Sequence, residues 1–105
     1  MAADVTSGCT VVAKAILGGF GFAIVSTAAT ADDTDYFDMD TLLGTDVNII
    51  WAKGVQDGTG TPADEPLSWT GSSTTPDRVT IGGSTDNKAR QCLIAFVSRS
   101  STGGD

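Results

Sequence analysis

The chain has 105 residues, the size of one domain with a single hydrophobic core. Charged residues make up only 18% of it, below the ~25% usual for soluble domains, and 13 glycines with many serines and threonines take their place. The formal net charge of −7 argues against binding to nucleic acid or to anionic membranes, and the absence of histidine removes the commonest general base and a favoured zinc ligand.

Residues 1–8 precede the first apolar run, and we expect them to form a flexible N-terminal arm. A single domain is predicted at residues 9–98, followed by a flexible C-terminal tail at residues 99–105. Low charge, frequent glycine and many β-branched residues favour an all-β domain.

The stretch KAILGGFGFAIVSTAATA at residues 14–31 has a basic residue, an apolar run and an A-x-A ending, which are the parts of a secretory signal peptide. However, thirteen residues precede Lys14, and glycines interrupt the apolar run. We therefore expect folded structure here instead of a cleaved leader. Because no apolar run approaches the ~20 residues that span a bilayer, we expect a chain that folds in the cytoplasm.

Two strands are predicted on either side of Gly18–Gly19, a dipeptide typical of a turn. The first covers residues 9–17 and the second residues 20–28. Alternation gives the second strand a bulky face and a small face. We expect the core to be lined by the bulky face, which consists of Phe20, Phe22 and Ile24. A neighbouring sheet or chain can lie close to the small face, which consists of Gly21, Ala23 and Val25.

Residues 36–40 alternate between apolar and polar types after an acidic crossover at residues 29–36. This alternation predicts a half-buried strand with Phe37 and Met39 turned toward the core. Residues 41–45 are expected to form a turn.

Residues 46–55 predict a central strand in which Val47, Ile49 and Trp51 share one face. Trp51 is expected to pack in the core, because it has the same phase as its apolar neighbours. Residues 56–66 contain glycine, proline, aspartate and threonine without periodicity, and predict a long loop.

Three further strands are expected at residues 67–71, 78–83 and 89–98. The last is apolar on both sides, which predicts a central strand that is buried on both faces. The chain as a whole predicts an all-β fold, an antiparallel β-sandwich or jelly roll of about six to eight strands.

The most acidic segment of the chain could bind calcium or could carry solvated surface charges. Its acidic residues are Asp32, Asp33, Asp35, Asp38 and Asp40. Closely spaced carboxylates are what calcium needs, but the spacing of a calcium-binding loop is missing. We favour solvated charges that keep sheet edges from aggregating, and no metal site is predicted.

Trp69 and the two cysteines leave alternatives open. Trp69, next to the long loop, is either at the edge of the core or an exposed contact residue. Cys9 and Cys92 are expected to be buried thiols, although a disulfide becomes possible if the first and last strands pair.

Catalytic chemistry is not predicted. The serines and threonines have no histidine to activate them, and GGFGF and GTG lack the flanking pattern of a phosphate-binding loop. We expect neither catalytic residues nor a cofactor, and a chain that is not an enzyme.

Four segments in succession, FAIVSTAAT, DTDYFDMDTLLG, VNIIWAKGVQDG and SWTGSSTTPDRVTIGGSTDNKARQCLIAFV, span residues 22–97. A late turn before the last strand combines Gly82, Gly83, Asp86, Asn87, Lys88 and Arg90. This order of features resembles small virion proteins of tailed phages, of the capsid decoration (cement) type. The resemblance implies a β-sandwich or jelly roll on the exterior of a capsid, made in the host cytoplasm.

The resemblance also implies the major capsid protein as partner and a homo-oligomer, with a trimer favoured over a dimer. Candidate contact residues are the arm, which could add a strand to a partner's sheet, the loop at residues 56–66, and Trp69. The arm residues concerned are Ala2, Ala3, Asp4, Val5 and Thr6. The alternatives are a minor tail or fibre subunit, and a carbohydrate-binding β-sandwich module for attachment to a host surface.

Overall fold

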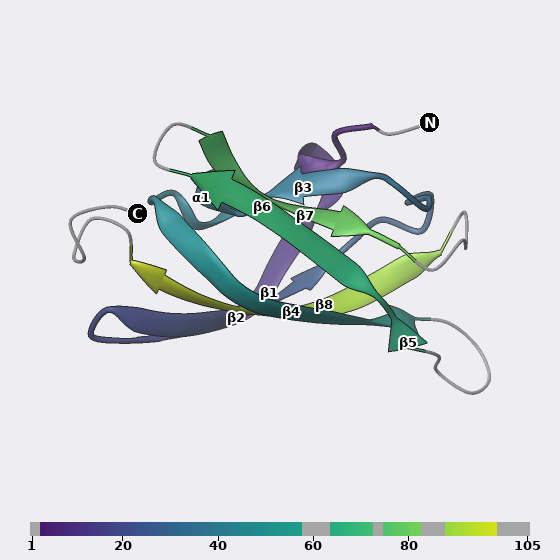
Figure 1. The fold of residues 1–105 in the computed structure, drawn as a ribbon. Helices are drawn as coiled ribbons and strands as arrows, with labels where there is room; N and C mark the ends of the chain where they lie inside the picture. The colour runs from purple at the N-terminus through teal and green to yellow at the C-terminus, as the bar shows by residue number, and fades with distance from the viewer. Residues whose placement is uncertain (1–2, 58–63, 73–74, 83–87, 99–105) are drawn as a thin grey trace.

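The computed structural model describes residues 3–57, 64–72, 75–82 and 88–98. Over these residues the chain forms two antiparallel sheets that face each other as the layers of a sandwich, the larger below and the smaller above in Figure 1. This confirms the all-β sandwich expected from the sequence. The predicted C-terminal tail, Ala2 and most of the loop at residues 56–66 lie outside the described residues.

The larger sheet has the strand order β1-β2-β8-β4-β5. Its strands are β1 (Thr10–Leu17), β2 (Phe20–Ser26), β8 (Ala89–Ser98), β4 (Val47–Asp57) and the short β5 (Asp64–Glu65). The smaller sheet has the order β3-β7-β6, with β3 (Tyr36–Asp38), β7 (Thr75–Ile81) and β6 (Leu67–Ser72). Two short helices complete the described elements, η1 (Thr6–Gly8) and α1 (Met39–Leu43).

The strand expected at residues 36–40 ends at Asp38, and α1 begins at the next residue. The carboxylate of Asp38 accepts hydrogen bonds from the backbone N–H of Asp40 (3.0 Å) and of Thr41 (3.4 Å), which caps the helix. Gly44, with φ of 73°, ends it in the left-handed conformation.

The core lies between the sheets and contains side chains from both layers. It consists of Ala23, Val25, Phe37, Met39, Val47, Ile49, Ala52, Val79, Cys92, Ile94 and Phe96. Phe37 and Met39 are fully buried, as their alternation predicts.

The two faces of β2 are the reverse of those predicted. Its small residues face the core, whereas Phe20 and Phe22 remain 43% and 40% exposed. The reason lies on the neighbouring strand, because the ring of Phe96 packs against Gly21: a Cβ built on this glycine would lie 2.9 Å from two ring atoms. Phe96 thus fills the inner volume that the bulky face of β2 was expected to fill.

Trp51 is also turned outward, contrary to the sequence prediction, and is 44% exposed. In the pairing of β4 with β8, Ile49 lies opposite Phe96 and Trp51 lies opposite Ala95, so Ile50 is an extra residue in a β-bulge. A bulge reverses the alternation of the residues that follow it. β8 is central as predicted, but Leu93 is 39% exposed, so one face of this strand is not buried.

Two carboxylates accept hydrogen bonds from backbone N–H groups of β4 that do not pair with another described strand. The Oδ1 of Asp40 accepts from the N–H of Val47 (3.0 Å), and the Oδ2 of Asp77, which is 3% exposed, accepts from the N–H of Ile49 (2.7 Å). These bonds satisfy strand donors that no described strand pairs.

Candidate binding surface

The larger sheet has one face turned away from the smaller sheet, and this face is apolar. The register places residues of four strands in rows across it. The first row is Leu17, Phe20, Val97 and Asn48, the second is Ala15, Phe22, Ala95 and Trp51, and the third is Ala13, Ile24, Leu93 and Lys53.

The large side chains of these rows are exposed to solvent. We call the outer face the set Leu17, Phe20, Phe22, Trp51 and Leu93, whose exposures are 73%, 43%, 40%, 44% and 39%. Since a large apolar side chain offers ~150–250 Å², these exposures amount to roughly 500 Å². An apolar patch of this size is at the upper end of what a monomer exposes, about 300–600 Å², and such patches are often functional.

Two hollows lie on the outer face, on either side of a ridge that Trp51 and Leu93 form together. One measures about 250 Å³ and is completed by Phe20, Phe22 and Ala95. The other measures about 320 Å³ and is completed by Ile24, Lys53, Val55 and Gln91. The surface is therefore corrugated, which suits a partner with protruding side chains.

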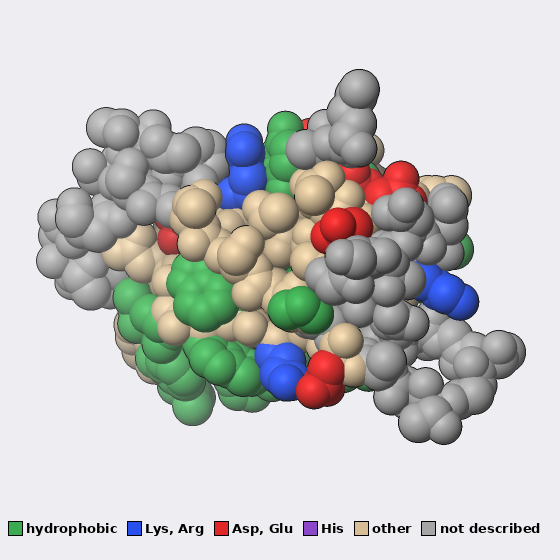
Figure 2. All heavy atoms as spheres, turned by 45° about the vertical axis from the view of Figure 1, so that its right-hand side comes forward, with side chains coloured by type: hydrophobic (Ala, Val, Ile, Leu, Met, Phe, Trp, Pro, Cys, Tyr) green, Lys and Arg blue, Asp and Glu red, His purple; other side chains and the backbone are tan. Residues whose placement is uncertain are grey.

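At the β5 end of the outer face, the bordering polar groups are bonded within the chain, and at the opposite end Asn48 lies opposite Val97. Lys53 forms an exposed ion pair with Asp64 at 3.3 Å, and Gln91 Nε2 donates to Ser26 Oγ at 3.1 Å. Hydrophobic side chains gather along the lower left of the view in Figure 2, the side on which the larger sheet lies.

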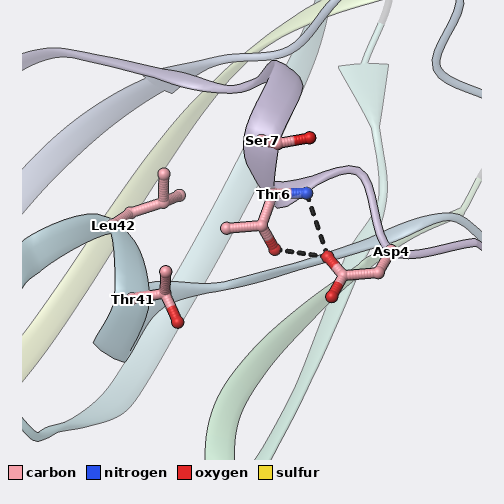
Figure 3. Close-up of a pocket in the computed structure, with 5 residues that line it drawn as sticks. All are labelled: Asp4, Thr6, Ser7, Thr41 and Leu42. Atoms are coloured by element: carbon pink, nitrogen blue, oxygen red, sulfur yellow. Dashed lines mark hydrogen bonds between the residues drawn. The ribbon is translucent and has the colours of Figure 1, made fainter.

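A third hollow, of about 370 Å³, lies between η1 and α1 and has a polar rim (Figure 3). Its lining residues are Asp4, Thr6, Ser7, Thr41 and Leu42. Asp4 Oδ1 accepts hydrogen bonds from the Thr6 hydroxyl and from the Thr6 N–H (3.0 Å). The hydroxyl bond, followed by the backbone bond, lowers the pKa of Asp4. The carboxylate therefore fixes the turn of η1, a structural role.

The N-terminal arm, as far as it is described, lies along its own chain. Val5 N–H donates to Tyr36 O (2.8 Å) and Tyr36 N–H donates to Ala3 O (3.0 Å), and the Thr6 hydroxyl accepts from the N–H of Asp38 (3.0 Å). Together these bonds attach the arm to β3 in a short parallel bridge.

Trp69, the other predicted contact residue, lies on β6 of the smaller sheet and is 36% exposed. It is thus exposed, one of the two alternatives, but it is not part of the outer face. Sequence reasoning missed the outer face itself. The signal that could have found it is the contrast in β2 between a row of small residues and a row of phenylalanines.

The sequence suggested that the acidic residues at positions 32–40 are solvated charges, but several of their carboxylates bind backbone N–H groups. Asp35 is 4% exposed, and its carboxylate accepts from the N–H groups of Ala3 (3.1 Å) and Asp32 (2.9 Å). Asp38 and Asp40 bind backbone N–H groups as described above. At least three of these acids therefore hold loops and strand ends in place.

Neither Cys9 nor Cys92 forms a disulfide bond. Cys92 is buried in the core, and the Cys9 thiol, half-buried, donates to Val5 O at 3.3 Å. Burial, with a smaller contribution from the charge of Asp4, raises the pKa of Cys9 to about 11. Its low thiolate content makes Cys9 a poor nucleophile.

Within the described ranges, no three histidine, cysteine or acidic side chains gather as metal ligands would. The same part of the chain contains no helix of the length and hydropathy needed to cross a membrane. Comparison of the sequence and structure with protein-family models, with curated proteins and with solved structures finds no match.

Proposed function

We propose that this chain is a structural protein of a virus particle, of the capsid decoration type, and that it binds the major capsid shell through its outer face. The observation that carries the proposal is the exposure of five large apolar side chains on one face of the larger sheet. The order of sequence features between residues 22 and 97, which resembles that of such proteins, supports the kind of partner.

The size of the outer face indicates how the binding works. Burying roughly 500 Å² at ~25 cal/mol per Å² stabilises a contact by about 12 kcal/mol, which is comparable to the ~4–15 kcal/mol that association costs. A single copy therefore binds weakly. Several linked copies that engage neighbouring shell subunits bind more tightly through effective concentration, which favours a homo-oligomer on the shell.

Sugar binding is the alternative that one observation favours, since Trp51 offers an exposed ring beside Lys53 and Gln91. Sugar recognition also needs hydrogen-bonding groups directed at the ligand. Lys53 pairs with Asp64 and Gln91 bonds Ser26, while the remaining lining is aliphatic or aromatic. The outer face therefore suits an apolar protein surface better than a sugar.

The test is co-sedimentation of the purified chain with shells assembled from the major capsid protein of the same genome. We expect the native chain to sediment with the shells up to a fixed ratio of copies. Phe22→Ser should reduce the bound fraction about tenfold or more, because it removes a central side chain of the outer face. Trp69→Ser is the matched control, since it removes an aromatic residue from the other layer.

Two results would contradict the proposal. One is a native chain that stays in the supernatant with intact shells. The other is a loss of binding with Trp69→Ser but not with Phe22→Ser, which would place the contact on the smaller sheet. Binding to tail structures instead of shells would favour the tail-subunit alternative. Quenching of tryptophan fluorescence by oligosaccharides, absent in Trp51→Ser, would favour sugar binding.

A further inference from the structure

We propose that β1 is a self-association edge, at which two copies of this chain pair β1 with β1 in antiparallel fashion and join their larger sheets into one. The proposal does not rest on the function proposed above. It rests on the open edge of the sheet, on the exposure of the β1–β2 hairpin and on the placement of the acidic residues.

β1 is the outermost strand of the larger sheet, and no described strand lies along its other side. The carbonyl of Ala15 points toward β2, since it lies 2.7 Å from where a Cβ of Gly21 would be. Alternation along an antiparallel strand then turns the N–H and C=O groups of Lys14 and Ile16 away from β2. These two residues offer donors and acceptors to a further strand.

The two edges of the larger sheet differ in how well their backbone groups are protected from pairing with another chain. At β4, the carboxylates of Asp40 and Asp77 occupy the strand donors of Val47 and Ile49, and β5 pairs with Gly54 and Val55. β1 has eight residues without proline, and among the described residues its protection consists of one charge, Lys14, and a bulge between Val11 and Ala13. Long apolar edges with so little protection pair readily with other chains.

Side chains on both faces of the hairpin are exposed. Leu17 is 73% exposed on the outer face, and Ile16, which shares the inner side of the strand with Gly21, is 52% exposed. Figure 1 shows the β1–β2 hairpin at the lower left, where it projects beyond the strands of the smaller sheet. A hairpin with apolar residues on two wet faces is stabilised when a further strand extends its sheet.

The distribution of charge favours a second copy as the partner. The chain carries a net charge of −7, so copies repel each other wherever acidic residues meet. β1, β2 and β8 contain no acidic residue, and those of the larger sheet are at positions 57, 64 and 65. β4 is three strands from β1, about 14 Å away, and β5 is one strand farther. These acidic positions therefore lie beyond the ~8 Å screening length from β1.

One register satisfies both the hydrogen bonds and the side chains. With the two-fold axis at Ala15, Lys14 lies opposite Ile16 of the second copy, and Leu17 lies opposite its Ala13. The outward groups of Lys14 then bond those of Ile16, as in the hydrogen-bonded pairs of an antiparallel ladder. The two Lys14 ammonium groups are not directly opposite each other, and each lysine stem packs on an isoleucine.

Such an interface is small. Val12, Ile16 and Leu17, each more than half exposed, and the paired backbone bury on the order of 500 Å² per copy, below the ~800 Å² of a standard interface. We therefore expect a reversible dimer with a dissociation constant on the order of tens of micromolar. This pairing closes with two copies, unlike the trimer that the resemblance implies.

The test is sedimentation velocity of the isolated chain from about 5 to about 500 µM, with two variants at one exposed position. Ile16→Lys sets a positive charge opposite Lys14 of the other copy, and Ile16→Glu sets a negative charge there. Both variants lose the same apolar contact, so their difference reports the register. We expect Ile16→Glu to dimerise about tenfold more tightly than Ile16→Lys, because each dimer contains two such cross-strand pairs.

Repulsion between the net charges of two copies predicts the opposite order of dimer affinity. The reason is that Ile16→Glu increases the net negative charge of each copy, whereas Ile16→Lys reduces it. Amide hydrogen exchange gives a reading without any variant: the Lys14 and Ile16 amides should become protected as concentration rises, whereas that of Ala15 is protected throughout. A chain that stays monomeric, a trimer, or equal dissociation of the two variants would overturn the proposal. Since no shells are present, failure here leaves the shell-binding test unaffected.

Discussion

Replacing Gly21 by alanine tests the packing that turns the bulky face of β2 outward. The added Cβ would lie 2.7 Å from the carbonyl oxygen of Ala15 and 2.9 Å from the Cε1 and Cζ atoms of Phe96. The first is a backbone atom, and the Phe96 side chain is only 2% exposed, so neither can move away freely. The cost is therefore steric.

The expected loss follows from two opposing effects. Overpacking a dense core costs about 1–3 kcal/mol, whereas glycine to alanine in an unhindered strand gains roughly 0.5–1 kcal/mol. We expect Gly21→Ala to lower the free energy of unfolding by about 1–2 kcal/mol. For a domain of this size, the melting temperature should fall by about 5–15 °C.

Urea unfolding at 25 °C, followed by circular dichroism, measures this loss from the midpoint at an unchanged slope. Gly8→Ala is the matched control: its Cβ would meet only Ala28 Cβ at an ordinary 3.5 Å, so a change within ~0.5 kcal/mol is expected. Phe96→Leu in the Gly21→Ala background should recover part of the loss as a favourable coupling. A Gly21→Ala variant as stable as the native chain, or strictly additive changes, would refute the steric argument.

Three further predictions concern single side chains. Asp77→Ala should cost about 1–3 kcal/mol in urea unfolding, because it leaves the buried N–H of Ile49 without its 2.7 Å acceptor; Asp77→Asn keeps an acceptor oxygen, and an equal loss in both variants would count against this role. With its pKa raised from 9.0 to about 11, Cys9 should react with iodoacetamide near pH 8 about 100-fold more slowly than an exposed cysteine. Since the unfolded thiol ionises first, stability should fall as the pH rises from about 9 through about 11, and a melting temperature constant over that window would contradict the raised pKa. Trp51→Ser should cost less than ~1 kcal/mol in thermal unfolding, because its ring is 44% exposed, and a loss above ~3 kcal/mol would place the indole in the core.

The approximate positions of most strands could be predicted from the sequence, but the sides that they present could not. The predicted loop at residues 56–66 is wrong at its described ends, because β4 continues to Asp57 and Asp64–Glu65 form β5. β8 occupies the residues expected for it, 89–98, because apolar and β-branched residues between turn signals are a local property. In β4, the phase of Trp51 depends on the bulge at Ile50. Ile50 is as apolar as its neighbours, so its residue type gives no sign that it is the extra residue.

The outer face was missed for a related reason. Whether Phe22 or Ala23 faces the core depends on Phe96, some seventy positions away in the sequence, which occupies the inner volume over Gly21. The role of Asp77 is equally non-local, because the N–H that it binds belongs to Ile49, 28 positions earlier. Pattern reasoning on one strand at a time finds neither relation, although it does find that the two faces of β2 differ in bulk.

The arrangement of β2 bears on the proposed binding more directly than composition does. An antiparallel sheet with one wet face usually alternates hydrophobic residues inward and polar residues outward. β2 instead alternates small residues inward with Phe20 and Phe22 outward. Polar residues at these two positions would leave the packing of Phe96 on Gly21 intact, so folding of the single chain does not require phenylalanine there. The shell binding proposed above accounts for the two phenylalanines, because it covers the outer face, and the β1 pairing proposed above would present two such faces together.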